Sequence, residues 1–332
     1  MKHLKVFVLS VISLAMLFLS NHRMVILTLT SANLLSLIAQ ADSYEQKTIT
    51  KEEQTANVTQ AILNPAFSLS DSVASSAFSS FINPGRSKGL QFKDPVVSPG
   101  LTYRRADDGA PGGFGGNELS GDIGLDADVY DGLIAGLIYQ HTYRGAENDL
   151  GTSEHLDSDG ISLYGAKRFL DLVNVGLAYN FAATHHRLTR SVIDNLDRDS
   201  HGFTILAGLS NKKVFWSDSN KWAWSSTASY GFVHDDYDAK IALDTGRFSW
   251  GAGLNFDVTK WWSFGTAFNY HWFIHQESFS GTTARDNDYW TIGPRFQFYP
   301  TDRITVSLDF DSQEGYKNLS AYTTRLGVDI AF

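Results

Sequence analysis

The sequence contains no cysteine and only seven prolines among its 332 residues. Without cysteine there can be neither a disulfide framework nor a thiolate metal site. Basic residues are also scarce, 27 against 36 acidic ones, and the net charge is −9. Binding to phosphate backbones needs a basic face, so we expect no nucleic-acid partner. After Ala41 no apolar run approaches the ~20 residues of a membrane-spanning helix, so any membrane residence must come from strands.

The first 41 residues have the pattern of a targeting segment. Two lysines lie close to an apolar run at residues 6–19, and a second apolar run covers residues 24–38. Ala39-Gln40-Ala41 is a small-x-small cleavage signal. The two runs indicate either a long signal or a translation start at Met24. We therefore expect residues 1–41 to be a signal peptide, and a retained anchor is the alternative.

Residues 42–98 are polar and rich in small side chains, without strand-like alternation. Within them, residues 71–82 place Val73, Ala77 and Phe81 at helical spacing, and Asn83-Pro84-Gly85 would end a helix. The pattern predicts a short helix at 71–82. The alternative is a disordered periplasmic linker.

Beyond Gly100 the sequence changes to period-two alternation that recurs up to the last residue. Alternation of this kind fits a soluble sandwich or a transmembrane barrel whose apolar face meets lipid. The alternating segments run for about nine to thirteen residues, longer than typical soluble strands and long enough for a tilted span. Short connections, as at Asp131-Gly132, alternate with longer polar ones, as at 106–118, 145–155, 188–200 and 235–245. Both features favour the barrel.

We count about twelve strands in residues 99–332, an even number that lets the last strand pair with the first. The predicted fold class is therefore all-β, a transmembrane antiparallel β-barrel preceded by a short helical or disordered segment. Aromatic residues near strand ends, as at Trp222/Trp224 and Trp261/Trp262, are typical of membrane-interface girdles. The expected strands start near Leu101, Leu119, Leu133, His155, Leu172, Ser200, Trp222, Gly246, Trp261, Asp288, Arg303 and Leu319.

The small and polar face of each strand would line the lumen, because a lipid-facing Arg or Lys costs ~2–4 kcal/mol near the midplane. Such residues could form a mixed-charge constriction, a plug-binding wall or a ladder of structural salt bridges. The predicted lumen-facing charged residues are Arg247, Arg295, Arg303, Arg325, Asp122, Asp126, Asp128, Asp257, Asp309 and Asp329.

The histidines do not predict a metal site. His271 and His275 would both point inward, but a spacing of four strand residues separates them by about 13 Å. His185-His186 lies elsewhere, and a metal ion needs three or four converging ligands. We therefore expect neither a metal nor a cofactor.

Catalytic groupings are also incomplete. His271 with Ser278 or Ser280 has no third group to orient the histidine, as a hydrolase requires. His234-Asp235-Asp236 has no second carboxylate pair that could complete a protease-like site. The sequence therefore predicts that the protein is not an enzyme.

Three phrases resemble the translocator (β-barrel) domain of autotransporters, the type V secretion family. They are Asp131–Tyr139 (DGLIAGLIY), Ser158–Phe169 (SDGISLYGAKRF) and Val175–Tyr179 (VGLAY), the last running on to Leu188-Thr189-Arg190. The strand number is similar too, and the terminal Phe332 resembles the signal read by the outer-membrane assembly machinery. The resemblance implies a twelve-stranded barrel whose preceding segment threads the pore.

These patterns predict a protein of the outer membrane of a Gram-negative bacterium, in contact with lipid, with extracellular loops and a periplasmic C-terminus. The oligomeric state stays open. Autotransporters usually carry a passenger of hundreds of residues, whereas only residues 42–98 lie between the signal and the first expected strand. Three hypotheses remain: a translocator with little or no passenger, a porin-like small-solute pore plugged by its N-terminal segment, or a surface protein that binds through its outer loops.

Overall fold

The computed structural model describes residues 95–108, 114–130, 133–148, 151, 153–169, 173–189, 195–210, 222–238, 241–276, 288–301, 303–315 and 319–332. The expected signal peptide at 1–41, the segment that follows it up to residue 94, and the helix at 71–82 lie outside these residues and stay predictions. No helix in the described part of the chain is both long and apolar enough to cross a membrane.

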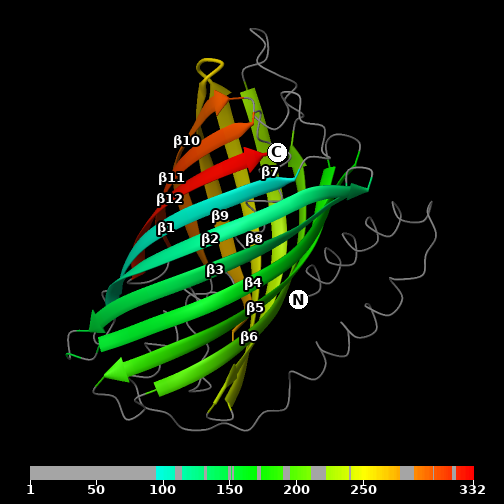
Figure 1. The fold of residues 1–332 in the computed structure, drawn as a ribbon. Helices are drawn as coiled ribbons and strands as arrows, with labels where there is room; N and C mark the ends of the chain where they lie inside the picture. The colour runs from blue at the N-terminus through cyan, green and yellow to red at the C-terminus, as the bar shows by residue number, and fades with distance from the viewer. Residues whose placement is uncertain are drawn as a thin grey trace. The chain divides into compact units, whose positions relative to one another are not determined.

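The described residues form twelve antiparallel strands in one closed barrel (Figure 1). Each strand pairs with its neighbours in sequence, and β1 also pairs with β12 over a ladder from Val96–Ala331 to Asp108–Leu319. This closure leaves no unpaired strand edge and confirms the predicted fold class. The strands are β1 (Val96–Asp108), β2 (Phe114–Tyr130), β3 (Leu133–Asn148), β4 (Ser153–Phe169), β5 (Val173–Thr189), β6 (Asn195–Ser210), β7 (Trp222–Tyr237), β8 (Ile241–Asp257), β9 (Trp262–Gln276), β10 (Asp288–Thr301), β11 (Ile304–Glu314) and β12 (Leu319–Ala331).

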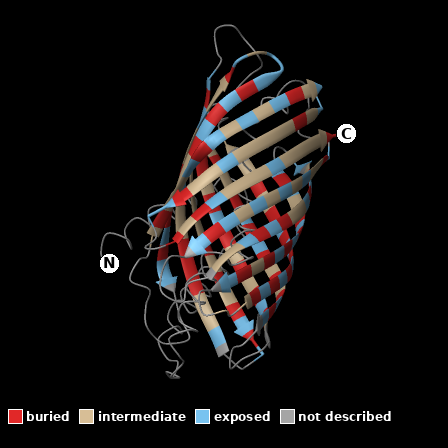
Figure 2. Cartoon of the chain, turned by 90° about the vertical axis from the view of Figure 1, so that its left-hand side faces the viewer, coloured by how far each residue is buried: buried red, intermediate tan, exposed pale blue. Residues whose placement is uncertain are grey.

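Buried and exposed residues alternate along the strands, as Figure 2 shows. The alternation follows from strand geometry, because successive side chains point to opposite faces of the sheet. On β2, for example, Leu125 is 52% exposed on the outer face and Asp126 is 5% exposed on the inner face. The outer face thus carries large apolar side chains and the inner face many polar ones. This distribution is the reverse of that in a soluble protein and is typical of a membrane-spanning barrel.

Exposed aromatic side chains lie toward both ends of the strands. Near the end where β1 begins and β12 finishes, they include Tyr130, Trp222, Trp224, Trp261, Trp262, Phe298 and Phe332. Nearer the opposite end they include Tyr103, Tyr143, Trp272 and Tyr322. Below, the end that holds both barrel termini is called the proximal end and the other the distal end. Aromatic rings in two groups are expected of a protein that crosses two membrane–water interfaces.

Most strands are longer than the sequence predicted, and the lengths run from 11 to 17 residues. The connection expected at 106–118 shrinks to the residues between Asp108 and Phe114, because β1 and β2 stay paired up to Asp107–Gly115. The connection expected at 235–245 likewise shrinks, since β7 ends at Tyr237 and β8 begins at Ile241. Backbone pairing continues where both faces are polar, so hydropathy alternation underestimates the strands there. The predicted contrast between short and long connections is correspondingly weak.

Candidate functional site on the inner wall

Charged side chains form a network on the inner wall near the middle of the strands, with Asp329 closer to the proximal end. It is here called the proximal network: Asp122, Arg295, Asp309, Arg325 and Asp329. The Nη2 atom of Arg325 lies 3.6 Å from Oδ2 of Asp122, and Nε of Arg295 lies 4.0 Å from Oδ1 of Asp309. Ser98 donates a hydrogen bond of 2.7 Å to Asp329. All five members were predicted to face the lumen, and the fold brings them together from β2, β10, β11 and β12.

A glycine permits the contact between Arg325 and Asp122. Asp122 on β2 is the register partner of Gly100 on β1, and β12 lies on the other side of β1. A Cβ at Gly100 would lie 2.6–2.9 Å from the Asp122 carboxylate group. The carboxylate therefore lies over the bare backbone of β1, and this position lets it approach a residue two strands away.

A glycine on the intervening strand also permits a contact of Asp126. Asp126, Gly136 and Tyr164 are register partners in a row across β2, β3 and β4. The Tyr164 hydroxyl donates a hydrogen bond of 2.9 Å to Asp126, and its ring lies within 2.5 Å of where a Cβ on Gly136 would be. Tyr164 also belongs to an apolar cluster of the inner wall, with Ile134, Ile138, Ala166, Ala178, Ala182 and Leu206. The inner wall of β3–β6 is thus partly apolar.

The remaining predicted residues lie apart from the proximal network. Arg247 is buried and donates a hydrogen bond of 3.2 Å to the Tyr289 hydroxyl group. Asp257 is buried at the end of β8. Arg303 lies in the turn before β11 with an exposed side chain, so the structure does not bring it to the network. Asp128 belongs to β2, and its side chain lies outside the described part of the chain.

A second group of inward-facing charges lies toward the distal end and is here called the distal ring: Arg104, Glu118, Arg144, Glu154, His186, Arg198 and Asp235. Except for the half-buried Arg104, their side chains are almost fully buried. Each of the strands β1 to β7 contributes one member. The ring therefore follows the wall around half of the barrel.

Glu154 joins three adjacent strands of the distal ring. Its Oε2 atom lies 3.3 Å from Nη2 of Arg144 on β3, and its Oε1 atom lies 2.7 Å from Nε2 of His186 on β5. A buried carboxylate with cationic or hydrogen-bonding partners on both sides fixes the positions of both neighbours, and such a group is costly to leave unpaired.

Arg198 and Asp235 form the next part of the ring. The Arg198 guanidinium group donates to the Tyr237 hydroxyl at 3.3 Å, and its Nε atom lies 3.8 Å from Oδ1 of Asp235. Ser200 donates a further hydrogen bond to Asp235. At the other end of the ring, Arg104 reaches past β12 to donate a hydrogen bond to Gln313 on β11.

The distal ring was not among the sites predicted from the sequence. Glu154, Arg198 and Asp235 fall in segments that were expected to be outer loops, because both faces of the strands are polar there. Glu118 could have indicated the ring, because it lies on the same face of the strand as Asp122 and Asp126. Extending the alternation through the polar segments would have placed these charges on the inner wall.

The inward orientation predicted for His275 is wrong. His271 is buried on the inner wall beside Ser249, at 2.8 Å, and its ring stacks on Tyr289. His275 is exposed, because the β8–β9 register shifts between Gly246 and Arg247. The extra residue on β9, Ile274, reverses the alternation, as a β-bulge does. The serines considered as partners of His271, Ser278 and Ser280, lie outside the described residues.

No protein-family model matches the sequence, and no curated protein matches it. Solved structures do match in fold. The translocator domain of the autotransporter NalP from Neisseria meningitidis superposes with a TM-score of 0.64 at 10% identity, over 85% of this chain and 100% of that chain. The β domain of the Bordetella autotransporter BrkA gives 0.57 at 9%, over 72% and 100%. An outer-membrane channel from Pseudomonas putida F1 gives 0.56 at 12%, over 75% and 99%. The resemblance to translocator barrels is thereby confirmed for the fold.

Proposed function

We propose that the chain is an outer-membrane β-barrel of the translocator type, whose lumen accommodates the segment before β1. The observation that carries the proposal is the inside-out distribution of side chains in a closed barrel. Exposed apolar residues such as Leu125, Leu163 and Leu177 cover the outer face, while charges such as Asp122 and Glu154 lie on the inner face. A wall with both charge signs offers donors and acceptors to a polypeptide segment.

The proposed orientation rests on the end of the barrel at which its two termini lie. An even number of strands puts the start of β1 and the end of β12 at the proximal end, and we assign this end to the periplasm of a Gram-negative cell. The exposed C-terminal Phe332 supports this assignment, because a terminal aromatic residue suits recognition by the assembly machinery. The distal connections would then be extracellular. The fold neighbours are transporter and channel barrels, which supports a non-enzymatic role.

The fate of residues 42–98 tests the translocator proposal. An epitope tag in this segment should become accessible to an added protease on intact cells, if the barrel displays it. The matched control places the same tag after Phe332, where it should be digested only after the outer membrane is permeabilised. Protection of both tags on intact cells would contradict display.

A second candidate is a small-solute pore that the N-terminal segment plugs. The distal ring favours it, because acidic and basic side chains around half of the wall suit a constriction for polar solutes. Deleting residues 71–82 should then raise the single-channel conductance in planar bilayers, while the N-terminal tag stays protected on cells. An unchanged conductance after the deletion would exclude this candidate.

A further inference from the structure

Histidine and aspartate side chains gather on the outer face of the barrel, toward the distal ends of β3 and β4. On β3, His141 lies between the exposed Tyr139 and Tyr143, and on β4 the next outward residue beyond the exposed Ile161 is Asp159. Asp157 follows on the same face of β4. The side chains of His141, Asp157 and Asp159 are 49%, 56% and 59% exposed. These groups therefore face the surroundings of the barrel and not its lumen.

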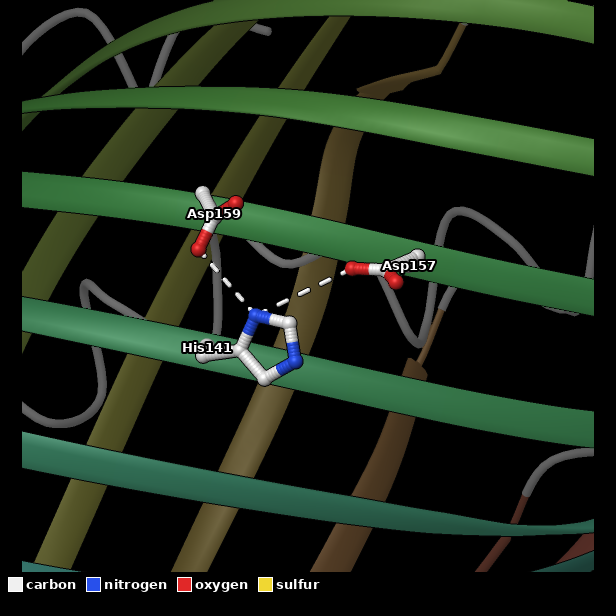
Figure 3. A group of neighbouring side chains, drawn as sticks. All are labelled: His141, Asp157 and Asp159. Carbon is white, nitrogen blue, oxygen red and sulfur yellow. Dashed lines mark hydrogen bonds and ion pairs between the residues drawn. The ribbon is translucent and has the colours of Figure 1, made fainter.

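The three side chains converge on one point, as Figure 3 shows. Nδ1 of His141 lies 3.1 Å from Oδ1 of Asp159 and 3.8 Å from Oδ1 of Asp157, and all three atoms lie within 4.8 Å of one another. Strand geometry produces the convergence. His141 is the register partner of Asp159, and Asp157 lies two residues further along the same face of β4.

A single imidazole nitrogen that faces two carboxylates differs from an ordinary ion pair. Nδ1 can donate only one proton, so it cannot hydrogen-bond fully to both oxygens. The two like charges also repel each other. A cation placed between the three atoms would bind all of them at once and offset this repulsion.

The spacing fits a tetrahedral metal ion. With metal–ligand distances near 2.1 Å, neighbouring ligand atoms of a tetrahedral zinc site lie about 3.4 Å apart. The two distances from Nδ1, 3.1 and 3.8 Å, fall on either side of this value. Tyr139 donates a hydrogen bond to Asp159, which would orient that carboxylate in the way outer partners orient metal ligands.

We propose that His141 Nδ1 and the carboxylates of Asp157 and Asp159 bind one zinc ion on the outer face of the barrel. One nitrogen and two carboxylate oxygens are ligands that zinc accepts, and three protein ligands leave a fourth position open. That position faces away from the barrel. The site would join β3 and β4 through an ion on the outer face of the barrel.

Another outward histidine, His234, serves as an internal control. His234 also contacts two aspartates, but through different nitrogens: Nδ1 lies 2.6 Å from Asp244 and Nε2 lies 3.3 Å from Asp236. These contacts diverge on opposite sides of the ring, so one ion cannot join them. A general attraction of zinc to exposed His–Asp pairs would act at His234 as well, whereas the proposed site uses only His141.

The test is calorimetric titration of zinc chloride into the full chain in detergent, with folding of each variant checked by the heat-modifiable mobility of its band. We expect the wild-type protein to bind one zinc ion more tightly than His141→Ala and Asp159→Asn, by at least about tenfold, and Tyr139→Phe to weaken binding less. His234→Ala should bind like the wild type. Affinity should also fall at acid pH, because a proton competes with zinc for Nδ1.

Two outcomes would overturn the proposal. The first is zinc binding by a folded His141→Ala variant with wild-type affinity. The second is a loss of affinity in His234→Ala as large as the loss in His141→Ala, which would indicate diffuse binding to surface histidines.

Discussion

Arg325 on β12 and Asp122 on β2 approach each other across the strand that closes the barrel. Their side chains are 3.6 Å apart although the residues lie far apart in sequence, and β1 runs between them. Gly100 leaves the space for this contact, because any Cβ there would collide with the Asp122 carboxylate group. The ion pair therefore links β12 to β2 across β1, where the first and last strands of the sheet meet.

This geometry predicts a coupling between Gly100 and Arg325. Gly100→Ala should displace Asp122 and weaken the ion pair, so it should lower the free energy of unfolding by about 1 kcal/mol. In an Arg325→Gln background the same substitution should cost much less, since the pair is already lost. Urea unfolding of the four proteins in lipid vesicles measures the coupling. Equal costs in the two backgrounds would contradict the role assigned to Gly100.

Leu308 and Ser307 test the orientation of the strands. Leu308 pairs with Phe296 and Leu326, which are 40% and 44% exposed on the outer face, whereas Ser307 pairs with the inner-facing Gln297. Leu308→Arg should therefore cost ~2–4 kcal/mol in lipid and block membrane assembly. Ser307→Arg should assemble normally. The amount of folded, heat-modifiable protein in the outer membrane is the measurement, and equal amounts of both variants would show that the assigned faces are wrong.

Gly293 is a site where the backbones of β10 and β11 come too close for any side chain. A Cβ there would lie 1.5 Å from the Phe310 carbonyl oxygen, a backbone atom that cannot rotate away. Gly293→Ala should therefore force the strands apart and cost at least about 2 kcal/mol. Gly121 is the matched control, because an added Cβ there meets nothing within 4 Å. Urea unfolding should separate the two variants, and similar midpoints would contradict the close approach.

Glu154 should be the most sensitive member of the distal ring. Glu154→Ala leaves Arg144 and His186 without their shared buried carboxylate, for which we expect a loss of about 3 kcal/mol. Asp199→Ala removes an exposed carboxylate from the outer face and should change stability by less than about 0.5 kcal/mol. The comparison uses the same vesicle unfolding assay. A Glu154→Ala protein as stable as the wild type would mean that the ring is not a stabilising network.

The strands with a clear contrast between apolar and polar faces could be predicted from the sequence. Trp222, Asp288 and Leu319 begin strands where expected, and the faces of the last strand agree with the exposure of Tyr322 and Leu326. Where both faces are polar, hydropathy contains no such contrast, so the distal strand ends and their buried charges were missed. The reversal at His275 could not be predicted either, because a bulge depends on pairing with another strand.

Side-chain contacts between different strands also could not be predicted from the sequence. His141 and Asp159 lie on different strands, and only the register of β3 with β4 brings them together. Likewise, Tyr164 on β4 reaches Asp126 on β2 only because Gly136, which has no side chain, lies between them on β3. A single sequence shows the residue types but not these partners, so the charges of the proximal network could be predicted individually while their contacts could not.

The most direct test of the central claim is cell fractionation followed by gel mobility with and without heating. A membrane-spanning barrel should be recovered in the outer membrane and give an unheated band that migrates as a compact species and shifts on boiling, because a closed barrel resists detergent until heated. Recovery as a soluble periplasmic protein without a heat shift would contradict the central claim. The exposed apolar face would then have to be covered by another protein surface and not by lipid.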